Sequence, residues 1–283
     1  KVKFGLGVAG HDWTENTTSP GSNKKWYGIT SSSDGTKLAA VVYNNSNGYI
    51  WTSSDSGATW TEDTSVGAPK IWTTITSSAD GTKLAAGVFN ANMWISTDSG
   101  ANWTEITSTG AGKNWREITS SSDGTKLAAT AYQGNIWTSS DSGATWTENT
   151  STGATKKWGP ITSSSDGTKL AVGVYNGNIW TSTDSGATWT ENTSTGAGKQ
   201  WYVITSSDDF TKLAAAVNYG NIWTSSDSGA NWTEITSTGV GKVWRGITSS
   251  TDGTKLAAVA SGSNIWTSSD SGATWTEDTS AGN

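Results

Sequence analysis

The chain contains no cysteine, one histidine (His11) and only two arginines, Arg116 and Arg245. Without cysteine there are no disulfides, so the fold has to be held together by packing alone. One histidine and no thiol leave a His/Cys metal site without a ligand set, and nothing supports a serine nucleophile activated by His11. We therefore expect no metal, no cofactor and no catalytic residues.

The chain also lacks clusters of basic residues and long apolar runs. Its formal charge of −6 argues against nucleic acid and anionic membrane surfaces as partners. No apolar run approaches the roughly 20 residues that span a bilayer, so we expect no membrane insertion. The chain starts at Lys1 without Met, as a processed protein would, and contains several Asn-x-Ser/Thr triplets. We expect an extracellular or periplasmic location.

Apolar residues make up only 33 % of the chain, but 19 tryptophans are present. A large aromatic ring can bury about 150–250 Å² of surface. Tryptophan is therefore predicted to be the main core material.

One motif recurs along the chain. Residues 53–60 read Ser-Ser-Asp-Ser-Gly-Ala-Thr-Trp, and close copies follow at intervals of 43 residues. An aspartate in such a turn can accept backbone N–H groups, and the glycine adopts a conformation closed to most other residues. We assign a structural role to the six aspartates of the motif, which are Asp55, Asp98, Asp141, Asp184, Asp227 and Asp270.

This pattern resembles the Asp-box, or bacterial neuraminidase repeat, of sialidase-type β-propellers. The resemblance implies the fold but not the activity, since one scaffold carries many functions. Sialidases hold the substrate carboxylate with three arginines, and this chain has only two. The array also resembles the propeller family of photosystem II assembly factors, which bind other proteins; those rings usually have seven blades.

Each repeat contains four short strand-like runs, as expected for a propeller blade. In the first repeat, strand A begins near Trp26, strands B and C cover residues 38–43 and 50–53, and strand D covers residues 59–63. We predict an all-β, six-bladed β-propeller of four-stranded antiparallel blades; the alternative is seven blades with one incomplete. Residues 26–283 form the propeller, and residues 1–25 are a degenerate half-repeat that helps to close the ring.

The two ends of a blade differ in how much the repeats vary. Strands alternate in direction, so the A–B and C–D turns share one end, and the B–C and D–A connections share the other. The turns of the first end are nearly identical between repeats, whereas the connections of the second end differ, for example at residues 43–49 and 132–135. Either turn chemistry keeps the residues of one end constant while those of the other end vary without a function, or the variable end carries a ligand surface.

A ligand surface at the variable end would suit sugars, because aromatic faces and amide groups match sugar rings and hydroxyls. Its candidate residues are Trp26, Trp72, Trp115, Trp158, Trp201, Trp244, Lys113, Lys156, Asn135 and Asn178. Alternatively, the lysine stems only pack over aromatic rings. The tryptophans of strands C and D, such as Trp51 and Trp60, are predicted to be core.

These observations favour a non-enzymatic binding propeller, with a glycan-binding, lectin-like module as the first hypothesis. The alternative is a protein-interaction or extracellular structural scaffold. Glu117 and Asp208, which lie outside the repeated frame, are predicted to be surface charges rather than a glycosidase pair.

One repeat breaks the rule for its A–B turn. Five repeats carry Asp-Gly there, whereas the fifth has Asp209-Phe210. If the turn keeps its shape, Phe210 must hold a positive φ, which costs about 1–2 kcal/mol for a residue with a Cβ. Either the turn relaxes to another type, or an exposed Phe210 ring packs against a ligand or a neighbouring molecule.

Overall fold

The computed structural model describes residues 24–43, 48–153 and 156–279, and these residues contain no helix. They form two compact units that meet in sequence at residues 156 and 157. The prediction for residues 1–25 falls almost wholly outside the described residues.

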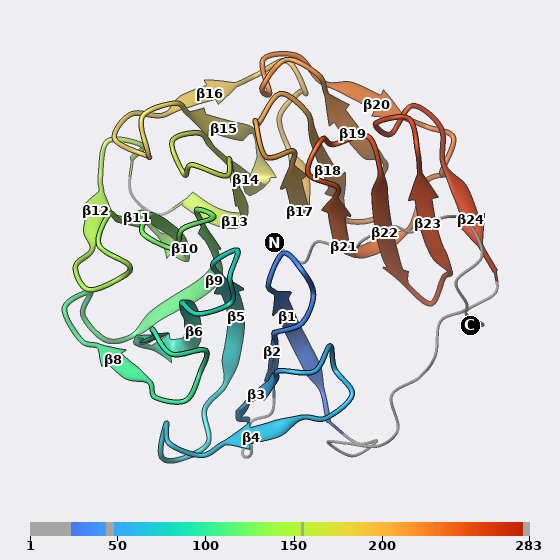
Figure 1. Ribbon diagram of the computed structural model, residues 1–283. Helices are drawn as coiled ribbons and strands as arrows, with labels where there is room; N and C mark the ends of the chain where they lie inside the picture. The colour runs from blue at the N-terminus through green and yellow to red at the C-terminus, as the bar shows by residue number, and fades with distance from the viewer. Residues whose placement is uncertain (1–23, 44–47, 154–155, 280–283) are drawn as a thin grey trace. The chain divides into compact units, whose positions relative to one another are not determined.

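The first unit holds three groups of four consecutive antiparallel strands, here called blades (Figure 1). The first blade is β1 (Trp26–Ser31), β2 (Leu38–Val42), β3 (Ile50–Ser53) and β4 (Thr61–Asp63). The second is β5 (Trp72–Ser77), β6 (Leu84–Ala91), β7 (Met93–Ser96) and β8 (Thr104–Ile106). The third is β9 (Lys113–Ser120), β10 (Leu127–Gly134), β11 (Ile136–Ser139) and β12 (Thr147–Asn149).

The second unit repeats this arrangement, and its first strand starts at the boundary. The fourth blade is β13 (Lys156–Ser163), β14 (Leu170–Gly177), β15 (Ile179–Ser182) and β16 (Thr190–Asn192). The fifth is β17 (Lys199–Ser206), β18 (Leu213–Val217), β19 (Ile222–Ser225) and β20 (Thr233–Ile235). The sixth is β21 (Val243–Ser249), β22 (Leu256–Ser261), β23 (Ile265–Ser268) and β24 (Thr276–Asp278). The all-β prediction is confirmed, and the number of blades in a closed ring stays a prediction.

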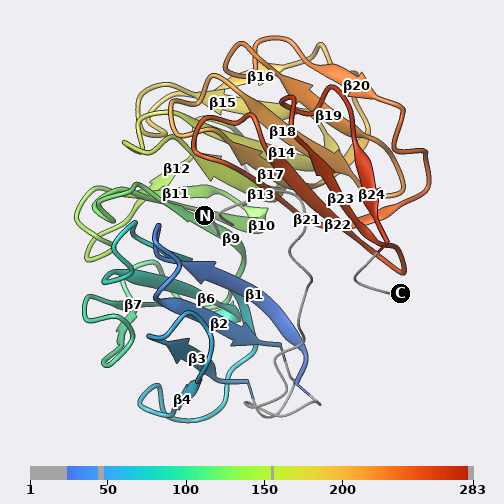
Figure 2. The same ribbon diagram turned by 45° about the vertical axis from the view of Figure 1, so that its right-hand side comes forward.

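Within a blade the strands pair in chain order, as β1 to β4 show in Figure 2. The Asp-containing motif of residues 53–60 forms the turn between β3 and β4, as predicted. It bonds to the A–B turn of its own blade, because the Ser56 N–H donates to the Thr36 carbonyl at 2.9 Å. The predicted sharing of one end by these two turns is therefore confirmed.

Strand A tryptophans supply the largest fully buried side chains of the blades. Trp115 is 1 % exposed and packs edge-to-face on Trp137 of strand C, with ring centroids 6.2 Å apart. The motif tryptophans directly precede strand D rather than lie in it as predicted, and they are only half-buried, as Trp146 is. The core prediction therefore fits the strand C tryptophan Trp137, which is 7 % exposed, better than the strand D series.

Replacing these two tryptophans tests the difference in burial. Trp115→Ala should lower the free energy of unfolding by about 3–5 kcal/mol, as a large-to-small core change. Trp146→Ala should cost only about 1–3 kcal/mol, because part of its ring already contacts water. Denaturant titration measures both values, and equal costs would contradict the assignment of the core to strand A.

The A–B turn of the fifth blade keeps the shape of the others. Phe210 has φ 65°, close to the 66° of Gly81, and its N–H donates to the Ser207 carbonyl at 3.1 Å. The expectation of an exposed ring is wrong, since Phe210 is 1 % exposed and belongs to a core cluster with Ile204 and Leu213. Burial of the ring offsets the backbone strain.

Phe210→Gly should therefore destabilise the protein. Loss of a buried aromatic ring costs about 3–5 kcal/mol, and relief of the positive φ returns about 1–2 kcal/mol. The expected net loss is about 1–4 kcal/mol by denaturant titration. A gain in stability would show that the ring contributes less than the strain.

Candidate binding surface

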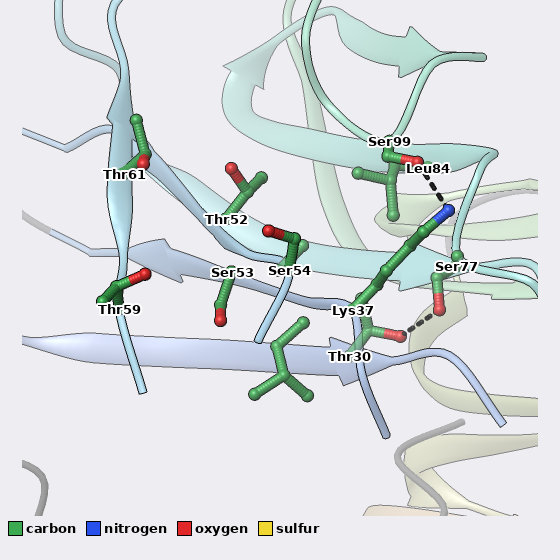
Figure 3. A pocket seen from close by; sticks show the side chains of 13 residues that line it. Thr30, Lys37, Thr52, Ser53, Ser54, Thr59, Thr61, Ser77, Leu84 and Ser99 are labelled. Atoms are coloured by element: carbon green, nitrogen blue, oxygen red, sulfur yellow. Dashed lines mark hydrogen bonds between the residues drawn. The ribbon is translucent and has the colours of Figure 1, made fainter. Parts of the chain in front are cut away.

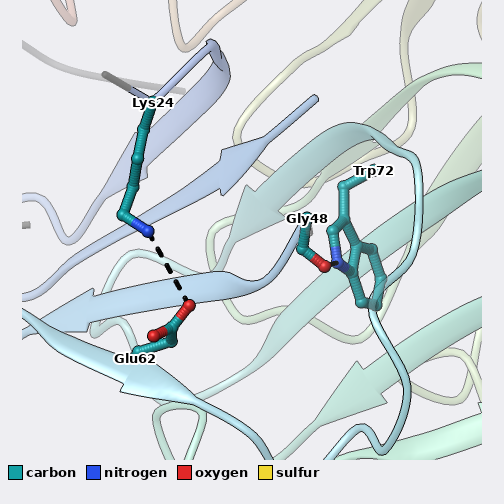
Figure 4. Close-up of polar contacts among 4 residues, drawn as sticks. All are labelled: Lys24, Gly48, Glu62 and Trp72. Atoms are coloured by element: carbon teal, nitrogen blue, oxygen red, sulfur yellow. Dashed lines mark hydrogen bonds and ion pairs between the residues drawn. The ribbon is translucent and has the colours of Figure 1, made fainter. Parts of the chain in front are cut away.

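Five of the six strand A tryptophans proposed for ligand binding are buried. Trp72, for example, is 0 % exposed, and its Nε1–H donates to the Gly48 carbonyl of the first blade at 3.1 Å (Figure 4). Trp115, Trp158, Trp201 and Trp244 are 0–1 % exposed. This burial contradicts the prediction that these five indoles form a ligand surface, because their faces are covered by protein. Trp26 differs, since it is 43 % exposed.

The proposed lysine ligands are engaged within the protein. Lys113 lies over the Trp137 ring, with Nζ 4.8 Å from the centroid, and its ammonium group donates to the Thr109 carbonyl. Lys156 donates to the Thr152 carbonyl at 2.6 Å. The structure thus matches the alternative in which lysine stems pack over aromatic rings, at least for Lys113. The Lys113 ammonium group also stabilises the connection between strand D and the next blade, because Thr109 lies in that connection.

The proposed asparagine ligands bond to strand D of their own blade. Asn135 Nδ2 donates to Glu148 Oε1, and Asn178 Nδ2 donates to Glu191 Oε1, both at 3.0 Å. Asn178 is only 8 % exposed. These amides join the B–C loop to strand D, and their assignment as groups that bind sugar hydroxyls stays a prediction.

The aspartates of the motif hold their own turn. Asp55 accepts bonds from the Thr59 N–H at 2.8 Å and from the Ser53 hydroxyl at 2.8 Å. The Trp60 Nε1–H closes the turn by donating to the Gly57 carbonyl at 3.1 Å. Equivalent aspartate bonds occur at Asp98, Asp141, Asp184, Asp227 and Asp270.

These bonds stabilise the ionised carboxylates. The Thr59 hydroxyl, followed by the Thr59 N–H and the Ser53 hydroxyl, lowers the pKa of Asp55 from 3.8 to about 2. In the A–B turn, the Ser32 hydroxyl and the Thr36 N–H lower the pKa of Asp34 to about 2 as well. The charged form is therefore favoured by folding at both turns.

Stability should consequently fall in acid. A carboxylate whose pKa is lower in the folded chain contributes stability above the unfolded value of 3.8, and this contribution is lost as pH falls toward 2. The denaturant midpoint should be level above pH 5 and decrease between about pH 4 and 2. Asp55→Asn should make this decrease shallower by one titrating group, and a midpoint unchanged down to pH 2 would contradict the account.

A surface cluster that the sequence did not reveal lies in the first unit. Tyr27 of β1 stacks on Tyr43, with ring centroids 5.2 Å apart, and Arg116 Nη1 of β9 donates to the Tyr27 hydroxyl at 2.8 Å. Tyr27 is 44 % exposed, and its neighbour Trp26 is 43 % exposed. We call Trp26, Tyr27, Tyr43 and Arg116 the Tyr–Arg surface.

The second unit contains a related pair. Arg245 Nη1 donates to the Tyr202 hydroxyl at 2.8 Å, and its guanidinium carbon lies 5.3 Å from the Tyr202 ring centroid. Tyr27, Arg116, Tyr202 and Arg245 all directly follow a strand A tryptophan. The sequence shows that this position varies between repeats, but only the structure shows that its tyrosines and arginines bond to one another.

No group of acidic, histidine or cysteine side chains suited to a metal ion occurs among the described residues. Within the same ranges, no helix has the length and hydropathy needed to cross a membrane.

The chain matches no protein-family model, and no curated protein matches its sequence. It is similar to the solved structure of YCF48 from Cyanidioschyzon merolae, with TM-score 0.68 and 15 % identity over 93 % of this chain and 88 % of that chain. The structure titled YCF48 bound to D1 peptide matches with TM-score 0.68 and 17 % identity, over 90 % and 81 % of the two chains.

A third similar structure is the GH74 xyloglucanase from Xanthomonas campestris, with TM-score 0.69 and 14 % identity. The match covers 88 % of this chain but only 45 % of the xyloglucanase. This chain is a β-propeller. At these identities the likeness extends to the fold alone, and one fold carries many functions.

Proposed function

We propose that this propeller is a non-enzymatic binding protein of the Asp-box type, and that it recognises another protein through the Tyr–Arg surface. The observation that carries the proposal is the exposed Tyr27 ring held between Tyr43 and Arg116. Tyrosine, tryptophan and arginine are enriched at protein interfaces, where a few such residues supply most of the binding energy.

The chemistry of the surface favours a peptide that carries a carboxylate. A guanidinium group pairs with carboxylates through charge-assisted hydrogen bonds. The Tyr27–Tyr43 stack provides flat aromatic area beside it, because Arg116 bonds to the Tyr27 hydroxyl. A similar propeller, YCF48, has a solved structure with a D1 peptide bound, which supports a peptide as the class of partner.

The state of the carboxylates supports a non-enzymatic role. A glycosidase needs one carboxylic acid with a raised pKa beside a second carboxylate. The turn aspartates, such as Asp34 and Asp55, have lowered pKa values instead. The strand D glutamates Glu148 and Glu191 accept bonds from asparagines.

Glycan binding is the second candidate function. Trp26 and Tyr27 favour it, since both expose more than two-fifths of their surface and an aromatic face can stack on a sugar ring. This site keeps Trp26 from the one predicted from the sequence, whose other five tryptophans are buried. An extracellular or periplasmic location is part of the proposal, and cell fractionation tests it.

Two arrays separate the candidates. On an array of peptides with and without a terminal or side-chain carboxylate, the wild-type protein should bind the carboxylate-bearing set. Arg116→Gln should weaken that signal at least tenfold because the cation is lost. Arg245→Gln is the matched control at the same repeat position in the second unit, and it should leave the signal intact.

A glycan array with the same variants completes the test. A glycan signal that Trp26→Ala removes, together with a blank peptide array, would replace protein binding by the second candidate. Two blank arrays would contradict both candidates.

A further inference from the structure

A pocket of about 120 Å³ lies between the first and second blades, at the end that carries the turns (Figure 3). Its walls combine the hydroxyl groups of Thr52 and Ser54 with the apolar side chains of Leu38 and Leu84. The Lys37 ammonium group is the cationic group of the wall. The pocket is separate from the Tyr–Arg surface, which shares none of its residues.

Lys37 behaves differently from the matching lysines of later blades. Lys83 Nζ donates to the Asp123 carbonyl of the next A–B turn at 2.9 Å, and Lys212 Nζ donates to the Asp252 carbonyl at 3.1 Å. Lys37 Nζ instead donates to the Ser99 hydroxyl at 3.1 Å. Its ammonium group therefore stays at the wall of the pocket, next to a hydroxyl group rather than a turn carbonyl.

Some residues that line this pocket are smaller than the matching residues of other blades. Gly81 lines the pocket, and the matching position of the fifth blade is Phe210, whose ring is buried. Thr52 also lines it, and the matching residue of the second blade is Ile95, which replaces the hydroxyl by an ethyl group.

A third lining position follows the same rule. Thr59 corresponds to Asn102 in the second blade and Asn231 in the fifth, which are larger side chains although all three bond to the aspartate of their own turn. The pocket thus has the smaller residue at all three positions, with Thr52 and Thr59 from the first blade and Gly81 from the second. The other described pairs within each unit carry at least one larger residue.

The lining groups indicate the chemistry of the ligand. Serine and threonine hydroxyls both donate and accept hydrogen bonds, as the hydroxyls of a polyol require. The ionised carboxylates of Asp55 and Asp98 belong to the same turns as the lining residues Thr59 and Ser99. Two negative charges near the pocket outnumber the one positive charge of Lys37, so binding of an anion is disfavoured. The volume approaches the roughly 150 Å³ of an engineered cavity that binds benzene, so a molecule or group of about six heavy atoms fits.

We propose that this pocket binds the neighbouring hydroxyl groups of a small neutral polyol, either free or at the end of a sugar. Lys37 and the hydroxyls of Thr52 and Ser54 hold the oxygens, and Leu38 and Leu84 contact the C–H face. The site is independent of the peptide surface proposed above.

Titration of ¹⁵N-labelled protein tests the proposal, with glycerol and methyl α-glucoside as the two probes and sodium acetate as the anionic comparison. Saturable shifts of the backbone amides of Ser54 and Gly81 are expected with at least one neutral probe. Glycerol alone would indicate a free polyol, and the glycoside alone the end of a sugar. Tighter binding of acetate than of both neutral probes would overturn the assignment to polyols.

The variant Thr52→Ile with Thr59→Asn places residues of the second blade in the pocket, so it should fold and should weaken the shifts at least tenfold. Thr181→Ile, the same change in the fourth blade, is the matched control and should leave them unchanged. No saturable shift in the wild type, or equal shifts in the double variant, would overturn the proposal. Peptide binding at Arg116 should survive the double variant, so the two proposals fail separately.

Discussion

In the second, third, fifth and sixth blades, a buried indole N–H joins the blade to the one before it, and the packing of these successive blades depends on this bond. Trp72 donates to Gly48, and the same bond recurs from Trp115 to Ala91, from Trp201 to Gly177 and from Trp244 to Gly220 at 3.0–3.2 Å. A buried donor without a partner would cost about 1–3 kcal/mol. The bond therefore holds both the indole ring and the backbone of the preceding blade in place. The backbone at Gly48 must also approach closely, because a Cβ there would lie 2.1 Å from the Lys70 carbonyl oxygen.

Much of the fold could be predicted from the sequence because turn chemistry is local. Asp, Gly and Ser at fixed spacing set the turns, and the structure has them where the motif of residues 53–60 predicts. The retained turn and the burial of the Phe210 ring could not be predicted in this way. Whether a positive φ is offset depends on what covers the ring, and that is decided by residues such as Ile204 that are only brought near by folding.

The candidate site was harder to predict, for a related reason. Repetition indicates that Trp115, Lys113 and Asn135 have a structural or functional role. It does not distinguish the two, because packing and binding both favour the same side chains. The structure assigns them to packing, through the Trp137 ring and the Glu148 carboxylate. The Tyr–Arg surface and the hydroxyl-lined pocket depend instead on residues that differ between repeats, and a contact between two such differences is visible only in three dimensions.

Hydrogen exchange of the indole N–H groups tests the central claim most directly. The account predicts that the Nε1–H of Trp72, Trp115, Trp201 and Trp244 exchange as slowly as the most protected backbone amides, because only large-scale opening exposes them. The indole N–H of the exposed Trp26 should exchange far faster. Equal exchange rates for Trp26 and Trp115 would contradict the claim that buried indole bonds hold successive blades together.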